Sequence, residues 1–389
     1  MEMNFDSTSA LWSFYNPVHL AAGCGIIEQL PQHLSEGKAL LVTTAGFTRR
    51  GLTGIMRELL GGRELLVLDS VSPNPTIDKL EGDARRLDGQ GIRQIIALGG
   101  GSAIDSAKAL SFMLAAGREF SLRGHFEEQS PLPDIRPLPL TAIPTTAGTG
   151  SEVTPFATIW DLSGEKKYSL SSPRLFARRA LLDPKLTLTL PRDLTVVTGL
   201  DALSHALESL WNRRANPITR AYALRAAAIA LETLPALAID LKNTELRTKM
   251  MEASLLAGLA ISGSRTALAH SISYPITARY GMPHGLACSF TLPAILEFNA
   301  AADDGRLLDA ARALGFASLG GFVEGIAELF KQLGVRDLLE QYIQGADDLL
   351  ILVPQMFTPG RADNNLRGLS SAQLREIIGR SLALLKISV

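Results

Sequence analysis

Short apolar runs that end in polar or glycine-rich loops recur four times in the first half of the chain. Each run has the length and the aliphatic or β-branched composition of a buried strand, and the segments between the runs have helical periodicity. Strands that alternate with helices predict βαβ units and a mostly parallel sheet, whose ligands bind at the carboxyl ends of the strands. The four runs lie within residues 39–47, 64–76, 95–98 and 139–143.

From Pro191 onward the pattern becomes helical and rich in alanine and leucine. The clearest amphipathic run is ITRAYALRAAAIALETLPALAIDL, residues 218–241. A chain of 389 residues exceeds the usual size of a single core, which also favours two domains. We therefore expect an α/β domain over residues 1–190 and an all-α domain over residues 191–389. Residues 344–367, with proline, glycine and paired asparagines, predict an exposed loop before the last helix.

The composition excludes several classes of function. Apolar residues make up 46% and charged residues 20%, and a net charge of −1 gives no attraction to nucleic acid or to an anionic membrane. No apolar run reaches the ~18–20 residues of a membrane span, and the first residues lack a signal-peptide pattern. Two cysteines, Cys24 and Cys288, cannot form a disulfide framework. We expect a cytoplasmic enzyme with a small-molecule substrate.

Two segments of the helical half carry three of the six histidines. Asp201 and His205 are four residues apart in GLDALSHALES, so both side chains lie on one helical face. His270 and His284 follow in ALAHSISYPITARYGMPHG, the first within an apolar helix and the second in a turn. One carboxylate and three imidazoles suit Fe(II) or Zn(II). An Asp/His pair at this spacing is by itself common on helix surfaces; the two later histidines favour the metal site.

Two loops after predicted strands have the composition of a phosphate-binding surface. LGGGSAIDSAKAL, residues 98–110, opens a helix, so its backbone N–H groups and the helix N-terminus favour an anion. PTTAGTGSEVT, residues 144–154, repeats the pattern. Neither contains the GxGxxG order or a Walker lysine, and a tight strand-to-helix turn is the alternative. Lys167, after an expected hairpin turn at residues 163–164, is interpreted as solvated, and Asp105 as a cap or bridge within its own helix.

The motifs GGGSAIDSAK, PTTAGTGSEVT and DALSHALES, together with Lys167, His270 and His284, resemble those of the iron-containing (group III) alcohol dehydrogenases. The resemblance covers nearly the whole chain. It implies a dinucleotide-binding N-terminal domain and a metal-binding helical domain, the architecture also found in dehydroquinate synthase, with metal and nicotinamide meeting between them. It further implies a homodimer or higher homo-oligomer formed through an N-terminal strand.

The resemblance also implies a role for each matching residue. The metal ligands are Asp201, His205, His270 and His284. The pyrophosphate loop is Gly99, Gly100, Gly101 and Ser102. The other residues that line the cofactor are Asn74, Thr145, Thr146, Thr149, Ser151 and Lys167.

Two residues depart from the family pattern. Thr44 stands where many relatives have an acidic residue that binds the ribose hydroxyls, and Arg49 and Arg50 follow. Loss of that carboxylate removes a repulsion on a 2′-phosphate, so we expect NADPH in preference to NADH. Tyr274 stands where many relatives have a proton-relaying histidine, and its unperturbed pKa of ~10 makes it a poorer shuttle at neutral pH. The relay then runs through Tyr274, water or the cofactor ribose.

A narrower resemblance concerns the substrate. WSFYNPV, PFATIWD and HALESLWNR resemble the phosphonate-metabolism branch of the family, whose members reduce phosphonoacetaldehyde to 2-hydroxyethylphosphonate. A dianionic substrate needs cationic partners, and Arg265, five residues before His270, is the first candidate. Arg279, Asn212 and Arg213 also flank the metal segments. The alternatives are a short-chain alcohol or diol dehydrogenase of the same family, a dehydroquinate synthase-like lyase, and a non-catalytic binding protein.

Overall fold

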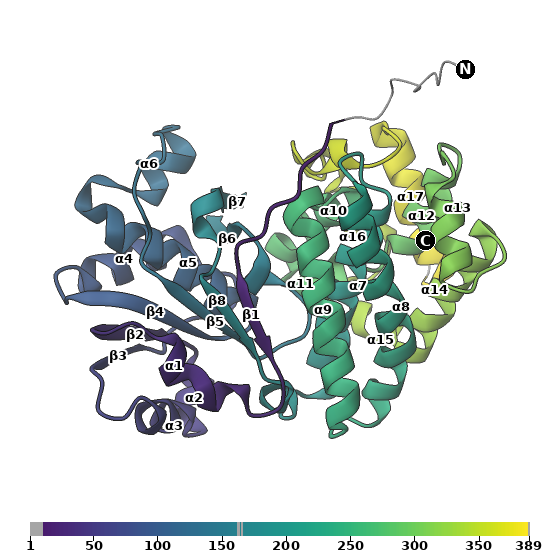
Figure 1. Ribbon diagram of the computed structural model, residues 1–389. Helices are drawn as coiled ribbons and strands as arrows, with labels where there is room; N and C mark the ends of the chain where they lie inside the picture. The colour runs from purple at the N-terminus through teal and green to yellow at the C-terminus, as the bar shows by residue number, and fades with distance from the viewer. Residues whose placement is uncertain (1–10, 162–163, 165, 388–389) are drawn as a thin grey trace, which may run out of the picture.

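The computed structural model describes residues 11–161, 164 and 166–387. They form a sheet with helices on both faces and a bundle of helices packed beside it (Figure 1). The last strand of the sheet ends at Leu182, and the first long helix of the bundle begins at Arg192. The expected fold class, a parallel-sheet α/β part followed by an all-α part, is confirmed.

The sheet has six parallel strands in the order β1-β8-β5-β4-β2-β3. The predicted strands are confirmed as β2 (Lys38–Val42), β3 (Leu65–Leu68), β4 (Ile92–Gly99) and β5 (Leu140–Pro144). The centre of the sheet is covered on both faces, which explains why its strands are near-continuous apolar runs. Gly99 and Pro144 are paired at the carboxyl ends of β4 and β5, so the two glycine-rich loops start side by side.

The sheet also contains two strands that the sequence pattern did not predict, β1 (His19–Ala22) and β8 (Arg179–Leu182). Each has only four residues, HLAA and RALL, with no β-branched side chain. β1 pairs with β8 and forms one edge of the sheet. Pairing with neighbouring strands, rather than the β-propensity of their own residues, therefore explains why these two strands form.

An antiparallel hairpin, β6 (Phe156–Asp161) and β7 (Lys166–Ser171), follows the loop after β5. Its register pairs Trp160 with Lys167. The expected reversal of the chain is present, although residue 163 of the predicted turn lies outside the described residues. β6 contacts helix α5 (Gly101–Ala116) of the sheet part, and β7 contacts helix α10 (Leu268–Tyr280) of the bundle. The hairpin therefore places Lys167 between the two parts.

The two faces of the sheet have separate apolar cores. One core includes side chains of α4, α5 and α6, and the other includes side chains of α1 and α3. α5 begins directly after β4 and is buried along most of its length, because it lies between the sheet and the hairpin. The helices of this part are α1 (Leu30–His33), α2 (Ala45–Arg49), α3 (Leu52–Leu59), α4 (Ile77–Leu87), α5 (Gly101–Ala116) and α6 (Leu122–Glu127).

The bundle is organised around α7 (Arg192–Leu210), which is buried on nearly every side. α8 (Pro217–Ile239), α9 (Thr244–Ser264), α10 (Leu268–Tyr280) and α11 (His284–Ala287) all contact α7. The remaining helices complete the core of the bundle. They are α12 (Leu292–Ala300), α13 (Arg306–Ala313), α14 (Leu319–Leu333), α15 (Val335–Leu339), α16 (Ala346–Leu350) and α17 (Ser371–Leu384).

Helix α8 confirms the predicted amphipathic run. Among the described helices it is the one long and apolar enough to cross a membrane by length and composition. Arg225 and Glu232 interrupt its apolar sequence, so α8 contains no uninterrupted apolar run of membrane-spanning length. Half of the most apolar window of α8 is buried, and the helix packs on α7 and α9. This packing is that of a core helix.

The expectation of an exposed loop over residues 344–367 is wrong. The segment contains α16 and two 3-10 turns, Val353–Gln355 and Ala362–Asn364, and several of its apolar side chains join the core of the bundle. Asn365 is fully buried and exchanges side-chain hydrogen bonds with Asn299 of α12 at 3.1 and 2.8 Å. The polar pattern therefore belongs to a buried, hydrogen-bonded connection rather than to a solvated turn.

Candidate active site

Three helices bring the four predicted metal ligands together. Asp201 and His205 lie one turn apart on α7, His270 lies in the first turn of α10, and His284 begins α11. Asp201 Oδ1 is 3.6 Å from His205 Nε2 and 3.7 Å from His270 Nε2. The ring centroid of His270 is 4.7 Å from that of His205 and 5.2 Å from that of His284. The two sequence segments therefore meet in the fold.

Each of the three histidines has a hydrogen-bond partner at Nδ1, so its Nε2 is the nitrogen left to bind a metal ion. His205 Nδ1 is 3.3 Å from the Gly148 carbonyl oxygen, and His284 Nδ1 is 3.4 Å from the Ser273 hydroxyl. His270 Nδ1 is 2.6 Å from a buried carboxylate. His270 Nε2 is buried and has no hydrogen-bond partner among the described residues. A buried nitrogen without a partner is costly, and a divalent metal ion would satisfy it, so these residues fit a metal.

The carboxylate that holds His270 belongs to Glu208, a fully buried residue of α7 that the sequence analysis missed. Glu208 also accepts hydrogen bonds from the backbone N–H groups of Ala267, Ala269 and His270 at the start of α10. Burial raises its pKa, but the charge and hydrogen bonds of His270 and its backbone donors bring the pKa below its usual value. Glu208 therefore fixes the His270 ring and joins α7 to α10. In the sequence, the position of Glu208 three residues after His205 was the available signal that it lies near the metal ligands.

Burial and mutual contact set the charges of the four side chains. Burial raises the pKa of Asp201, but the three imidazoles bring it well below its usual range. Burial lowers the pKa of His205 to about 4 and lowers that of His284 well below its usual value. Burial acts the same way on His270, but the Cys288 thiol and nearby carboxylates raise its pKa above the usual value. Ionised carboxylate and neutral imidazole are the forms that bind a metal, which would displace a proton from His270.

Cys288 adds a sulfur to this cluster. Its sulfur is fully buried and lies 3.4 Å from Asp201 Oδ1 and 3.6 Å from the Gly285 carbonyl oxygen, and either oxygen can accept the one thiol proton. One ligand atom from each of Asp201, His270, His284 and Cys288 lies within 4.8 Å of the others. Burial raises the pKa of the thiol to about 11, so the metal-free cluster holds a neutral thiol. The sequence analysis did not propose Cys288 for this site, although it follows His284 by four residues.

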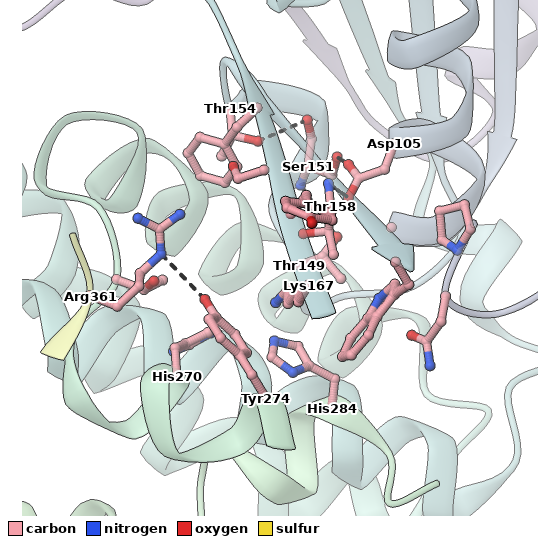
Figure 2. A pocket seen from close by; sticks show the side chains of 18 of the residues that line it. Asp105, Thr149, Ser151, Thr154, Thr158, Lys167, His270, Tyr274, His284 and Arg361 are labelled. Atoms are coloured by element: carbon pink, nitrogen blue, oxygen red, sulfur yellow. Dashed lines mark hydrogen bonds between the residues drawn. The ribbon is translucent and has the colours of Figure 1, made fainter. Parts of the chain in front are cut away.

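A cleft of about 420 Å³ opens over the cluster. Its walls come from the sheet part, the hairpin and the bundle, and Figure 2 shows side chains from these elements pointing into it. The structure therefore brings predicted cofactor and metal residues to the walls of one cleft. The predicted residues that line it are Asn74, Gly101, Ser102, Thr149, Ser151, Lys167, Asp201, His205, His270, Tyr274 and His284.

The other predicted loop residues do not line the cleft. They are Gly99, Gly100, Thr145 and Thr146. The Thr145 N–H donates to the Gly99 carbonyl oxygen at 3.0 Å, which links the two loops. A Cβ on Gly101 would lie 2.6 Å from Thr149 Cγ2. Glycine is therefore required at position 101 for the close packing of the loops, whether or not its N–H also contacts a ligand.

A buried polar network holds the second loop against α5. Lys108 is fully buried, and its Nζ donates to the Ser151 hydroxyl at 3.2 Å and to the Thr154 carbonyl oxygen at 2.8 Å. Burial lowers the pKa of Lys108 to about 8. Asp105 accepts from the Ser151 hydroxyl and, at 2.8 Å, from the Thr158 N–H. The interpretation of Asp105 as a cap or bridge within its own helix is therefore wrong. Lys108 was missed, although it follows Asp105 by three residues.

Tyr274 lies beside the metal ligands with two cations around it. Its ring centroid is 6.2 Å from that of His284 and 3.7 Å from Lys167 Nζ, and its hydroxyl oxygen accepts from Arg361 Nε at 3.3 Å (Figure 2). Burial raises the pKa of Tyr274, but Lys167 and Arg361 bring it down to about 8. Lys167 also lies 5.7 Å from the Trp160 ring, so its interpretation as solvated is wrong. Arg361 was missed because it lies in the segment interpreted as an exposed loop.

Two family models match the chain in succession. The model described as iron-containing alcohol dehydrogenase matches residues 17–184, and the C-terminal model of the Fe-containing alcohol dehydrogenase family matches residues 195–382. The chain belongs to the iron-containing alcohol dehydrogenase family. This confirms the resemblance seen in the motifs and makes the protein an oxidoreductase that acts on alcohols.

Members of this family with different substrates are similar to the chain. A choline dehydrogenase of Bacillus subtilis (strain 168) is 32% identical over 306 residues, 77% of this chain and 75% of its own. A phosphonoacetaldehyde reductase of Streptomyces viridochromogenes is 35% identical over 241 residues, 60% of each chain. The crystal structure of sulfoacetaldehyde reductase from Bifidobacterium kashiwanohense in complex with NAD+ matches with a TM-score of 0.86 and 30% identity, over 95% of this chain and 98% of that one.

Thr44, which was predicted to favour NADPH, lies just beyond β2 at the start of α2. It forms an isolated bridge with Ser70 beyond β3 and does not line the cleft described above. Arg49 and Arg50 are exposed, and the Arg50 guanidinium packs over the Phe47 ring at 4.6 Å. These residues lie at the carboxyl edge of the same sheet as the two glycine-rich loops.

The predicted substrate residues do not line the cleft. Asn212 is fully buried, and its side chain donates to the Arg265 carbonyl oxygen at 3.1 Å. Arg213 and Arg279 are exposed. Arg265 is half-buried, and its guanidinium donates to the Ser171 hydroxyl of β7 at 2.9 Å.

Proposed function

We propose that the protein is a metal-dependent aldehyde reductase that exchanges a hydride between a nicotinamide cofactor and a small aldehyde, with phosphonoacetaldehyde as substrate and 2-hydroxyethylphosphonate as product. The observation that carries the proposal is the buried, unpartnered Nε2 of His270. It lies within a cluster of further nitrogen and oxygen ligands at a cleft that the predicted cofactor loops also line. Metal ligation gives this nitrogen the direct partner that no hydrogen bond within the described residues provides.

The proposed ligands of Fe(II) or Zn(II) are Asp201, His205, His270 and His284. For NAD(P)H we propose residues 99–102 and 144–154, with Asn74 and Lys167. Their support is the position of both loops at the carboxyl edge of a parallel sheet and of the first at the N-terminus of α5. NADPH is favoured over NADH by the lack of a carboxylate at Thr44 and by the exposed Arg50 nearby.

When bound, the metal provides a Lewis acid for the carbonyl oxygen, and the reduced nicotinamide provides the hydride. The Tyr274 hydroxyl donates the proton, so that one aldehyde, one hydride and one proton give one alcohol. Lys167 and Arg361 stabilise the phenolate that remains, which is the physical reason for a tyrosine pKa of about 8. The walls of the cleft exclude water and orient the aldehyde.

The charge of the cleft supports an anionic aldehyde. Lys167 and Arg361 both line it, and both lie within contact of Tyr274. Cations in a partly desolvated cleft favour a negatively charged substrate. The similar proteins that reduce phosphonoacetaldehyde and sulfoacetaldehyde act on aldehydes of this kind.

A second candidate is a dehydrogenase of uncharged alcohols or diols, or of the cationic alcohol choline, which the similarity to a choline dehydrogenase favours. A dehydroquinate synthase-like lyase has less support, because the fourth ligand and the 144–154 loop follow the dehydrogenase pattern.

We further propose a homodimer or higher homo-oligomer in the cytoplasm. The edge strand β1 supports assembly, together with the large apolar side chains exposed before it, of which Leu11 is 103% and Tyr15 is 66% exposed. The free thiol of Cys24, which is exposed, supports a reducing compartment. We also propose that the two domains divide near residue 190, in the connection between β8 and α7.

The proposal is tested by stripping the protein with a chelator, reloading it anaerobically with Fe(II), and following NADPH absorbance with phosphonoacetaldehyde and with propionaldehyde. We expect turnover only after reloading, and a kcat/KM about 100-fold higher for the phosphonate. In the same assay, kcat/KM for phosphonoacetaldehyde should be lower with NADH than with NADPH. Similar values for both aldehydes would contradict the narrow substrate and leave a general reductase. No oxidation of NADPH by either, with metal bound, would contradict the reductase itself.

A further inference from the structure

Arg361 reaches the cleft beside the metal ligands with hydrogen-bonding capacity to spare. Its Nε donates to the Tyr274 hydroxyl oxygen at 3.3 Å, and its Nη1 donates to the carbonyl oxygen of the preceding Gly360 at 2.8 Å. Within the described part of the chain, Nη2 has no hydrogen-bond partner and no carboxylate lies within ion-pair distance of the guanidinium. A half-buried guanidinium without a carboxylate has the geometry and charge to bind an oxyanion from solution.

The segment that carries Arg361 is attached to the helix that carries His270 and Tyr274. The Thr358 N–H donates to the Ser271 hydroxyl at 2.8 Å, and that hydroxyl donates to a main-chain carbonyl of the same segment. Ser271 directly follows His270 on α10. Helix α10 therefore fixes the distance between a proposed metal ligand and the guanidinium, and the site is preorganised.

The two carboxylates that line the cleft form no ion pair with Arg361 among the described residues. Among the residues lining the cleft, Asp105 of α5 accepts hydrogen bonds from Ser151 of the 144–154 loop and from Thr158 of the hairpin. Asp201 lies among the imidazoles of the proposed metal ligands. Lys167 contributes a second cation on the other side of the Tyr274 ring, 3.7 Å from its centroid, and makes no ion pair with any described residue. Arg361 and Lys167 thus bring two cationic side chains to the wall of the cleft around Tyr274 (Figure 2).

Arg265, the arginine that the sequence favoured for substrate binding, is already engaged. Its guanidinium donates to the Ser171 hydroxyl at 2.9 Å and packs over the Phe156 ring at 5.1 Å. Phe156 lines the cleft, and Arg265 lies behind this ring rather than on the wall itself. Arg361 is thus the better-placed cation for a group that enters the cleft.

We propose that Arg361 is a specificity-determining residue that binds the terminal oxyanion of a short aldehyde. This rests on the proposed reductase activity and names its substrate class, an aldehyde that ends in a phosphonate or sulfonate. Nη2 donates to the head group while the carbonyl lies toward the metal ligands. Tyr274 contacts both the His284 ring and the Arg361 guanidinium, so the two proposed binding positions lie on either side of one side chain.

The test compares Arg361→Met with the wild-type enzyme, both reloaded with Fe(II), on phosphonoacetaldehyde, sulfoacetaldehyde and propionaldehyde. Loss of the contact with Tyr274 should lower kcat/KM for all three aldehydes, and we expect the fall to be about tenfold to a hundredfold larger for the two anionic aldehydes than for propionaldehyde. Competitive inhibition by methylphosphonate and methanesulfonate should weaken by a similar factor. Whichever head group, phosphonate or sulfonate, shows the larger change is the one that the site prefers. Arg361→Lys should recover part of the loss.

Arg312→Met, which removes an exposed arginine of α13, is the matched control and should change none of these values. Equal losses for all three aldehydes would mean that Arg361 only positions Tyr274, and would overturn the inference. So would a charge-specific loss in Arg265→Met without one in Arg361→Met. A wild-type enzyme that reduces only propionaldehyde would overturn the inference and leave the family activity intact. A wild-type enzyme that reduces no aldehyde would instead contradict the proposed function.

Discussion

His270 is held more tightly than the other two proposed imidazole ligands. Its Nδ1 is 2.6 Å from the Glu208 carboxylate, whereas the Nδ1 atoms of His205 and His284 are 3.3 and 3.4 Å from neutral oxygens. Glu208 also binds the backbone at the start of α10, so one residue sets both the orientation of the ring and the position of the helix. A carboxylate behind a ligating histidine raises the basicity of the imidazole and fixes its tautomer.

Glu208→Gln tests this role. Glutamine keeps the shape of the side chain but turns an NH₂ donor toward backbone N–H groups, so we expect the affinity for Zn(II) or Co(II) to fall about 10–100-fold. The measurement is the metal Kd by competition with a chromophoric chelator. Glu376→Gln, on the exposed face of α17, is the control and should bind metal like the wild type. An equal Kd for all three proteins would mean that Glu208 does not support the site.

At the residue scale, the sequence predicted those site residues whose roles follow from their type and their spacing along the chain. Asp201 and His205 could be paired because a helix places residues four apart on one face. Glu208 and Cys288 were missed because their roles depend on contacts between helices that are far apart in the chain. Arg361 was missed for the same reason, since a hydrogen bond to a residue 87 positions earlier leaves no local pattern.

The 144–154 loop is the element that connects the two parts of the molecule. The Gly148 carbonyl oxygen accepts from His205 Nδ1 of α7 at 3.3 Å, and Gly150 packs against Gly258 of α9. A Cβ on Gly258 would lie 2.7 Å from the Gly150 Cα and 2.9 Å from the Gly150 carbonyl oxygen. These backbone atoms cannot rotate away, so the contact requires glycine at position 258.

Gly258→Ala should therefore destabilise the protein by about 1–3 kcal/mol, although alanine favours a helix. The displaced loop should also raise the KM for NADPH. Gly379→Ala in α17 is the matched control, because nothing lies within 4 Å of the added Cβ, and it should stabilise by about 0.5–1 kcal/mol. Urea unfolding curves measure both effects. A gain in stability for both variants would contradict the packing argument.

At the element scale, the strands with aliphatic or β-branched runs were predictable, and β1 and β8, which have no β-branched residue, were not. β2, β4 and β5 carry apolar runs because helices cover both faces of the sheet. The four-residue β1 and β8 carry no such run, since pairing with neighbours sets them. The segment 344–367 was misinterpreted because its buried asparagines satisfy one another and the backbone, which sequence composition does not reveal.

At the scale of the whole molecule, the cleft lies where the sheet part, the hairpin and the bundle meet. The sequence predicted the sheet and the bundle, and the family resemblance implied that the site lies between them. The charge of the cleft was not predictable, because Lys167 and Arg361 approach Tyr274 from segments almost two hundred residues apart. The boundary near residue 190 stays a prediction.

The central claim is that these helices hold one catalytic metal ion, and iron content tests it most directly. Wild-type protein, His270→Ala and His19→Ala are stripped, reloaded anaerobically with Fe(II), and desalted before elemental analysis. His19 lies on the exposed edge strand β1, so its variant controls for the loss of any histidine. We expect about one iron per chain in the wild type and in His19→Ala, and little or none in His270→Ala. Equal iron in all three proteins would contradict the account.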